Sequence, residues 1–255
     1  MGEQIIDNFS PDYVIPFKVP KNQVMDAFQK FSKKPLTPKD FSCDRVVDKM
    51  QGVYIPFWLY SGNCEGSITA EGINTRTWTS GNYRYTEKKY YSVYRNGTLD
   101  FKAVPVDASS KTDDDAMDSI EPFDYSEMTA FNPGYLSGYL AERYDEDKDK
   151  CLPRAKERIE NTTRDELRNT CNYNSVNVQS YEKHTEIKDV KYAMLPTWLL
   201  YTTYQDKPYF FAMNGQTGKF IGNLPISKGK LVAYSLLGGV GGYIIGAILQ
   251  IMGIF

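Results

Sequence analysis

The chain contains one histidine, His184, within the polar run from Glu182 to Glu186. A Ser-His-Asp or Cys-His catalyst would have to use this side chain. Its charged neighbours indicate a solvated strand end or turn instead of a catalytic pocket. A metal site that needs several histidines is impossible within one chain. We therefore predict no catalytic residue here.

The four cysteines are far apart in the sequence, at Cys43, Cys64, Cys151 and Cys171. No Cys-x-x-Cys pair occurs, and such pairs are the usual way in which a chain supplies thiolates to a structural zinc ion. The spacing therefore predicts no metal site, and no cofactor is expected. Free thiols in a reducing cytoplasm are the simplest interpretation.

Three alternating aspartates, Asp145, Asp147 and Asp149, match the first three ligands of a calcium-binding loop. The match ends there, because Lys150 occupies the position of the glycine and Lys156 that of the bidentate glutamate. Solvated acids between two helices are the better interpretation.

A second acidic run lies between Lys111 and Glu121. Its members are Asp113, Asp114, Asp115 and Asp118. A solvated surface loop accounts for this run, and docking of a basic partner is the alternative.

The run from Asn214 to Phe220, NGQTGKF, resembles a phosphate-binding loop but fails the spacing test. Such a loop needs four residues between its first glycine and the Gly-Lys pair, and then Ser or Thr. Here two residues intervene and Phe220 follows. A turn between two strands is the better interpretation.

Composition narrows the function classes. The 255 residues carry a net charge of −2, so a nucleic-acid-binding protein is not expected, because phosphate contacts need a basic surface. Hydrophobic residues make up 41% of the chain, which is enough for a normal core. Twenty tyrosines and thirteen phenylalanines favour a β-rich fold.

Helices are predicted at three places from apolar periodicity and end signals. The first covers about residues 21–33 and ends before Pro35. The second covers 132–144, where Asn132-Pro133 supplies a cap and a first-turn proline. The third covers about 152–168, with one apolar face.

Strands are predicted on both sides of these helices. Residues 52–60 form a buried strand, and strands at 83–94 and 98–104 are joined by a turn at Asn96-Gly97. Strands resume at residue 173 and continue to 221. The expected fold class is α+β, with an antiparallel β-rich domain over residues 1–227.

The two strand regions contain a repeated motif. Pro56-Phe57-Trp58-Leu59 parallels Pro196-Thr197-Trp198-Leu199, each copy following an apolar residue, and each is followed downstream by Asn-Gly. We infer an internally duplicated β-meander, with β-units at 52–109 and 173–227 and helices inserted at 118–170; chance similarity is the alternative. Pro56, Trp58, Pro196 and Trp198 are the predicted structural core.

The C-terminal segment from Leu231 to Phe255 contains no charged residue. As a helix it would be about 37 Å long, enough to cross a hydrocarbon core of about 30 Å. We therefore predict one transmembrane helix at 231–255, a buried core helix being the alternative. Lys228 and Lys230 precede the segment, so the positive-inside rule places the large N-terminal domain in the cytoplasm of a single-pass protein of the cell membrane.

Three glycines of this segment, Gly238, Gly242 and Gly246, are spaced by four residues. Such spacing places them on one helix face and lets two helix backbones approach closely in lipid. Helix association, and with it a homo-oligomer, is the expectation; glycines tolerated without pairing are the alternative.

A set of motifs resembles one bacterial family. The motifs are Ile15-Pro16-Phe17, Gly52 to Leu59 (GVYIPFWL), Glu121-Pro122-Phe123-Asp124, Tyr135 to Asp145 (YLSGYLAERYD) and Asn214 to Lys219 (NGQTGK). They are similar to those of zinc-ribbon-associated membrane proteins often mislabelled as primosomal helicase fragments. The resemblance covers about residues 13–227. Members carry a cysteine zinc ribbon before the Ile-Pro-Phe segment, which is absent here, so zinc is not carried over.

This resemblance implies protein partners, because relatives occur beside stress genes for a flotillin-like (SPFH) and a phage-shock-type protein. The leading hypothesis is a non-enzymatic, membrane-anchored adaptor that binds the lipid bilayer and such partners. The alternative is a membrane-associated enzyme that uses carboxylate, Lys or Tyr chemistry on lipid or peptide. A cleft with converging buried carboxylates would favour the enzyme, and an exposed aromatic surface would favour the adaptor.

Overall fold

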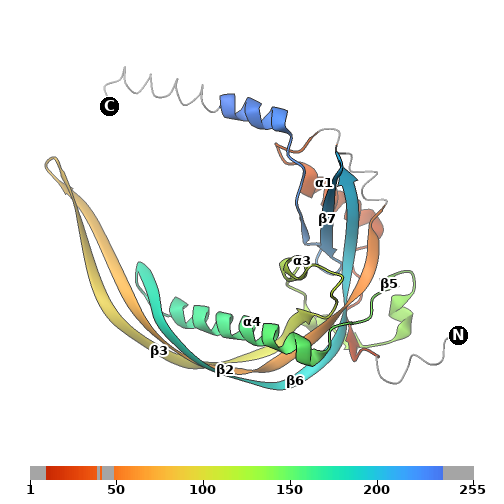
Figure 1. The fold of residues 1–255 in the computed structure, drawn as a ribbon, viewed down its shortest axis with the longest axis horizontal. Helices are drawn as coiled ribbons and strands as arrows, with labels where there is room; N and C mark the ends of the chain where they lie inside the picture. Colours follow the sequence, from red (N-terminus) through yellow and green to blue (C-terminus); the bar gives the residue numbers. More distant parts are fainter. Residues whose placement is uncertain (1–9, 39–40, 42–48, 238–255) are drawn as a thin grey trace.

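The computed structural model describes residues 10–38, 41 and 49–237, and these form one sheet of eight strands (Figure 1). The strands are β1 (Tyr13–Val14), β2 (Gln51–Ser80), β3 (Tyr83–Asp107), β4 (Thr129–Ala130), β5 (Leu140–Ala141), β6 (Ser175–Tyr204), β7 (Lys207–Asn214) and β8 (Phe220–Gly222). Within the described residues, the helices are α1 (Lys21–Ser32), α3 (Asp114–Ser119) and α4 (Lys148–Asn169), with short 3-10 turns η1 (Tyr125–Glu127) and η2 (Pro133–Leu136). Residues 228–237 are also helical.

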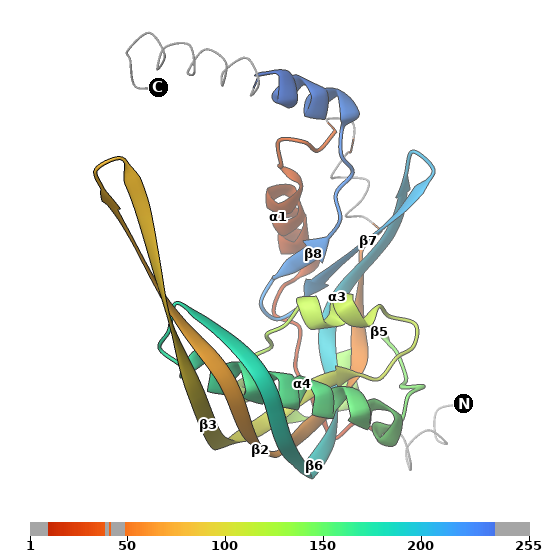
Figure 2. The same cartoon turned by 60° about the vertical axis from the view of Figure 1, so that its left-hand side comes forward.

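Three long strands give the molecule its shape. β2 and β6 have 30 residues each and β3 has 25, so a straight strand would reach roughly 100 Å. Figures 1 and 2 show the three strands bent into an arc with α4 on its concave side. The pairing register shifts at Gly62 on both neighbours of β2 and again at Ala70 on the β6 side. Such irregularities bend a strand and increase its twist.

Helix α4 covers the concave face with its apolar stripe. Ala155, Ile159 and Leu167 are buried at helical spacing, as the periodicity predicted. The helix begins four residues earlier than expected, at Lys148, because the Asp147 side chain accepts a hydrogen bond from the Lys150 amide. Leu167 packs with Ile68 and Val93 of the sheet, so this end of the arc has its own small core.

Glycine permits the close approach of α4 to β2. A Cβ atom added at Gly66 would lie 2.9 Å from Thr163 Cγ2 and 3.1 Å from Leu167 Cδ1. We expect Gly66→Ala to lower the free energy of unfolding by about 1–2 kcal/mol, because the helix must move to admit a methyl group. Gly97→Ala, directly opposite on β3, is the control, since its Cβ would make an ordinary 3.6 Å contact. Equal losses in urea denaturation would contradict this explanation.

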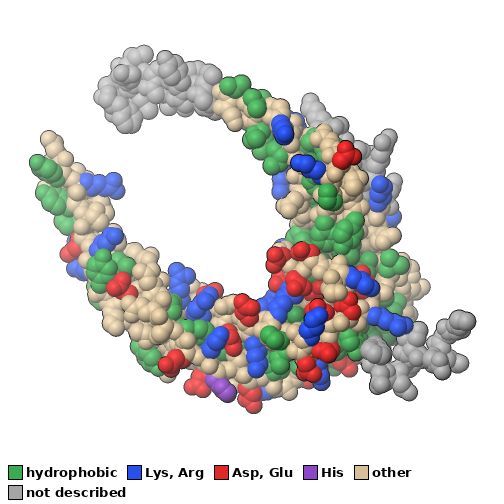
Figure 3. Space-filling model, viewed as in Figure 1, with side chains coloured by type: hydrophobic (Ala, Val, Ile, Leu, Met, Phe, Trp, Pro, Cys, Tyr) green, Lys and Arg blue, Asp and Glu red, His purple; other side chains and the backbone are tan. Residues whose placement is uncertain are grey.

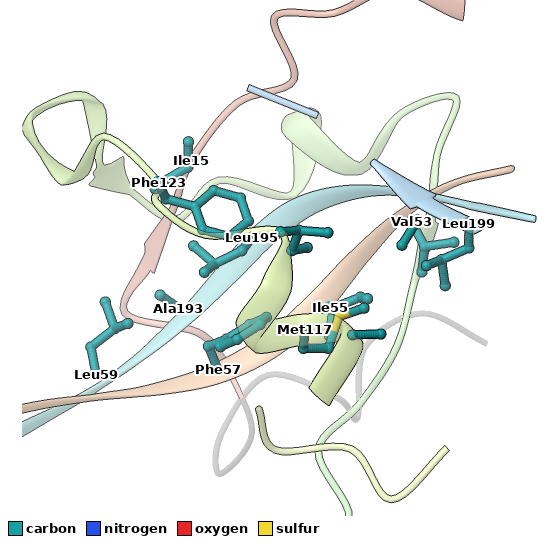
Figure 4. Packing of buried hydrophobic residues seen from close by; sticks show 13 residues of the cluster. Ile15, Val53, Ile55, Phe57, Leu59, Met117, Phe123, Ala193, Leu195 and Leu199 are labelled. Atoms are coloured by element: carbon teal, nitrogen blue, oxygen red, sulfur yellow. The ribbon is translucent and has the colours of Figure 1, made fainter. Parts of the chain in front are cut away.

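The largest core lies where the first half of β2 pairs with the second half of β6, under α3 (Figure 4). Ile55 and Phe57 of β2 and Leu195 of β6 meet Met117 of α3 and Phe123 there. A second core lies under α1, where Phe28 packs edge-on against Phe211 with ring centroids 5.4 Å apart. The predicted helix at 21–33 is thereby confirmed in extent, as α1 runs from Lys21 to Ser32.

The two copies of the proline motif are antiparallel neighbours. Pro56 lies opposite Met194, Pro196 lies opposite Tyr54, and Ile55 lies opposite Leu195 at the centre. The Pro56 carbonyl accepts from the Ala108 amide at 3.0 Å, and the Pro196 carbonyl accepts from the Gly215 amide at 2.8 Å. The motif copies therefore occupy matching positions about the Ile55–Leu195 pair. Duplication of the whole β-unit stays a prediction.

The two tryptophans of the motif share one face of the sheet but differ in burial. Trp198 is buried and its Nε1 donates to the Val19 carbonyl at 3.0 Å. Trp58 is half-buried and its Nε1 donates to the Glu146 carbonyl at 2.9 Å. Pro56 and Pro196 are both buried.

Two local predictions are wrong. Asn96-Gly97 does not turn the chain; both residues lie inside β3, opposite Ser67 and Gly66, and the turn is at Gly81, where φ is +61°. The helix predicted at 132–144 is reduced to η2. Asn132 caps it and Pro133 starts it, but the chain leaves the helical path by Gly138, whose φ is +86°.

The predicted fold class needs correction in two respects. The sheet is mixed, because β1 pairs parallel to β6 and β5 pairs parallel to β2. The sequence could not reveal these pairings, because each covers only two residues. Few helices are present, and they cover the sheet at separate places along the arc (Figures 1 and 2).

The prediction of a transmembrane helix at 231–255 is also wrong, and with it the single-pass localisation in the cell membrane. Within the described residues, no helix is long and apolar enough to cross a membrane. Among the described residues of this segment, those up to 237 are helical. The remaining residues, 238–255, with Gly238, Gly242 and Gly246, lie outside the described residues, so the predicted helix association stays a prediction.

Candidate protein-interaction surface

The sequence candidates for chemistry lie at separate places. His184 lies in β6 opposite Glu65, on the outer face of the arc. Cys64, Cys151 and Cys171 are buried free thiols, and Cys43 lies outside the described residues. Burial raises the pKa of the Cys151 thiol to about 12, so it is protonated and unreactive at neutral pH.

The two acidic runs act mainly as helix caps and ion-pair partners. Asp145 accepts from the amide and hydroxyl of Ser110, and Asp147 caps α4. Asp113 caps α3 through the Ala116 amide, and Asp114 pairs with Arg154 at 2.6 Å. No group of three metal-ligating side chains occurs in the part of the chain that the structure describes.

The segment from Asn214 to Phe220 forms a turn between β7 and β8, as predicted. Asn214 is fully buried, and its Oδ1 accepts from the amides of Gln216 and Thr217 at 2.9 Å. Its Nδ2 donates to the carbonyls of Ile120 and Pro122. The amides of Gln216 and Thr217 are therefore used inside the turn and are not free to hold a phosphate.

One half-buried carboxylate, Glu121, is paired with arginine. Its two oxygens accept from Arg158 at 3.0 and 2.8 Å, and Asp118 accepts from the same guanidinium at 3.1 Å. Burial raises the pKa of Glu121 above its ordinary value, against the lowering effect of Arg158. This bidentate geometry is that of a structural ion pair that joins α4 to the chain after α3.

A second carboxylate, Asp107, is buried, with 1% of its surface exposed. Its Oδ2 accepts from the Thr112 hydroxyl at 2.6 Å and its Oδ1 accepts from the Ser109 amide at 3.3 Å. Burial raises its pKa to about 7 despite these two bonds. Enclosure of this kind gives Asp107 no access to a substrate.

A different surface meets the criterion for an adaptor. β2 and β3 continue beyond the end of β6, because the last β2–β6 pair is Ile73 with Ser175. We call residues 74–89 the arm: Asn74 to Ser80 pair with Tyr83 to Lys89, and no third strand supports them. Figures 1 and 2 show the arm as the free end of the arc. Every residue from 75 to 92 is exposed.

Aromatic rings gather on one face of the arm. Trp78 lies opposite Tyr85, and their rings stack with centroids 5.6 Å apart and planes inclined by 14°. Trp78, Tyr85 and Tyr83 are 43%, 46% and 72% exposed. Strand pairing and alternation place Trp78, Tyr85 and Tyr83 on one face of the ribbon, which we call its aromatic face.

The arm is also basic. It contains four basic residues, Arg76, Arg84, Lys88 and Lys89, and one acidic residue, Glu87. The Arg76 guanidinium lies 5.7 Å from the Trp78 ring centroid, within the range of a cation–π contact. Exposed aromatic rings and arginine are the side chains that contribute most to binding at protein interfaces.

A two-stranded ribbon without a third strand or a covering helix is marginally stable in water. The Trp78–Tyr85 stack and the 3.5 Å hydroxyl contact of Thr77 with Thr86 on the other face support it. Sequence reasoning missed the arm as a site, although the concentration of aromatic and basic residues from Arg76 to Lys89 was visible. Such a concentration by itself is equally typical of an ordinary strand.

These features define a class: a curved, mixed-sheet protein with an aromatic, basic arm. The chain is 38% identical over 236 residues to the uncharacterised protein YdjG of Bacillus subtilis (strain 168), and it belongs to the family of that protein. The match covers 92% of this chain and 69% of YdjG. No family model matches the chain, and no solved structure does.

Proposed function

We propose that this protein is a non-enzymatic scaffold that binds another protein through the aromatic face of the arm. The observation that carries the proposal is the exposed Trp78–Tyr85 stack on a ribbon that lies outside every core of the molecule. Rings that are large, rigid and exposed lose little conformational entropy on binding and bury much apolar area.

The enzyme alternative is less well supported by the geometry. An enzyme of the kind considered above would need a cleft in which buried carboxylates converge. Glu121 is held by Arg158, and Asp107 is enclosed by Thr112 and Ser109, so each carboxylate serves the fold. The scaffold proposal therefore uses the arm, which has no evident role in stabilising the rest of the molecule.

The test compares full-length chains purified from cross-linked, nuclease-treated cells. Trp78→Ser with Tyr85→Ser removes the stack, and Thr77→Ser with Thr86→Ser changes the opposite face of the same ribbon. We expect the first pair to reduce at least tenfold one or more proteins that co-purify with the unchanged chain, measured by mass spectrometry. The threonine variant should keep them.

Both variants alter exposed side chains, so the free energy of unfolding should change by no more than about 0.5 kcal/mol. A flotillin-like or phage-shock-type protein is the first candidate among the captured proteins, on the strength of the family resemblance. An identical set of captured proteins with and without the Trp78–Tyr85 stack would refute the proposed role of the arm.

A further inference from the structure

A groove of about 910 Å³ opens beside β7, at the end of the molecule away from the arm. Its apolar wall includes Tyr201 and Phe210, whose rings are 4.7 Å apart, together with Tyr209. Asp113 and Asp115 stand on its other side together with one basic residue, Lys111, and all three are exposed. The groove therefore offers aromatic rings and carboxylates side by side.

The arm has the complementary chemistry. It carries a net charge of +3, whereas the whole chain carries −2, so the residues outside the arm carry −5. Figure 3 shows basic side chains on the free end of the arc and a concentration of acidic ones near α3. Guanidinium and ammonium groups bind both aromatic faces and carboxylates, and opposite charges steer two surfaces into register.

We propose that the groove beside Tyr201 receives the arm of a second copy of this chain. The inference rests on the proposed function, because it names one partner of the arm. Its Trp78 and Tyr85 would pack against Tyr201 and Phe210, while its basic side chains approach Asp113 and Asp115. A chain cannot fill its own groove in this fold, since the arm and β7 lie at opposite ends of the arc (Figures 1 and 2).

The symmetry of such a contact is fixed by its two surfaces. Arm and groove are different parts of the chain, so the contact is heterologous, and each copy gives one arm and receives another. Repetition produces a ring if the rotation closes and an open chain of copies if it does not. The proposal thus assigns self-association to the folded domain, independently of the C-terminal glycines.

Two one-sided variants of the full chain test the contact by analytical ultracentrifugation. Trp78→Ser with Tyr85→Ser removes the arm surface, and Asp115→Lys with Tyr201→Ser removes the groove surface. We expect the unchanged chain to self-associate with concentration and each variant alone to do so at least tenfold more weakly. Mixing the two variants should give a one-to-one pair and nothing larger, because only one intact arm and one intact groove can meet.

The matched control is Asp100→Lys with Tyr94→Ser, which makes the same types of change at exposed sites on β3 outside the arm. It should assemble like the unchanged chain. An unchanged chain that stays monomeric up to about 1 mM, or a mixture that forms no pair, overturns the proposal. If the arm variant loses co-purifying proteins while self-association is absent, this inference fails and the scaffold function stands; if neither changes, both fail.

Discussion

Arg158→Ala is expected to lower the free energy of unfolding by about 3 kcal/mol, measured by urea denaturation at pH 7. The loss leaves Glu121 with a charge and no cation, and the carboxylate side chain is 17% exposed. It also removes the donor to the Pro105 carbonyl and one of two arginine donors to Asp118, the other being Arg154. We place the effect at the lower end of the range for broken buried pairs, because the Arg158 side chain keeps 26% exposure.

Two further variants separate charge from packing. Adding Glu121→Gln to the Arg158→Ala chain should recover part of the loss, because the uncompensated charge is removed. Arg164→Ala is the control, since its 3.2 Å pair with Asp165 is exposed and should contribute less than about 1 kcal/mol. Similar losses for Arg158 and Arg164 would mean that the Glu121 pair is not a special feature of this fold.

The helices were the most predictable part of the fold. The stripe of Ala155, Ile159 and Leu167 identified α4 because its burial repeats with the period of a helix. The residues from Asn132 onward carry correct helix-start signals, but only the short turn η2 forms there and not the helix expected at 132–144. There the chain must pair Ala141 with Tyr54 of β2, and Gly138 with its positive φ turns it toward the sheet.

The length of the strands was not predictable. Asn96-Gly97 is a strong hairpin signal, yet both residues lie inside β3, where Gly97 is paired with Gly66 of β2. Gly66 is the glycine that admits α4, and this packing depends on residues far away in the sequence. Packing against the rest of the fold therefore overrides the local turn preference of Asn96-Gly97. The turn lies at Gly81 instead, and β3 begins just after it at Tyr83.

The buried polar groups illustrate the same limit. No local signal distinguishes Asp107, which ends β3, from the solvated aspartates that follow it. Asp107 occupies a position that the second motif copy repeats. In the first copy Asp107 is the strand partner of Phe57. In the second copy Thr197 stands in place of Phe57, and its strand partner is Asn214. Each side chain accepts from an amide two residues further on, Ser109 in one case and Gln216 in the other. One copy uses an acid where the other uses an amide.

This difference leads to an expected pH dependence of stability. Burial raises the pKa of Asp107 from 3.8 to about 7, so the folded chain holds a proton that the unfolded chain releases. The favourable contribution is complete below the unfolded pKa and is lost as the pH rises through 7. Between pH 5 and pH 8 the free energy of unfolding should fall by about 2.5 kcal/mol through this group.

Asp107→Asn should remove that fall, because an amide of the same shape keeps an acceptor for the Ser109 amide and does not ionise. The variant is therefore expected to be more stable than the unchanged chain at pH 8, in urea denaturation followed from pH 5 to pH 8. Asn214→Asp is the reciprocal change and should deepen the fall, since it buries a second acid at the matching position. Asp100→Asn, an exposed site, controls for general titration. Parallel curves for Asp107→Asn and the unchanged chain would show that Asp107 is already ionised in the fold at pH 5.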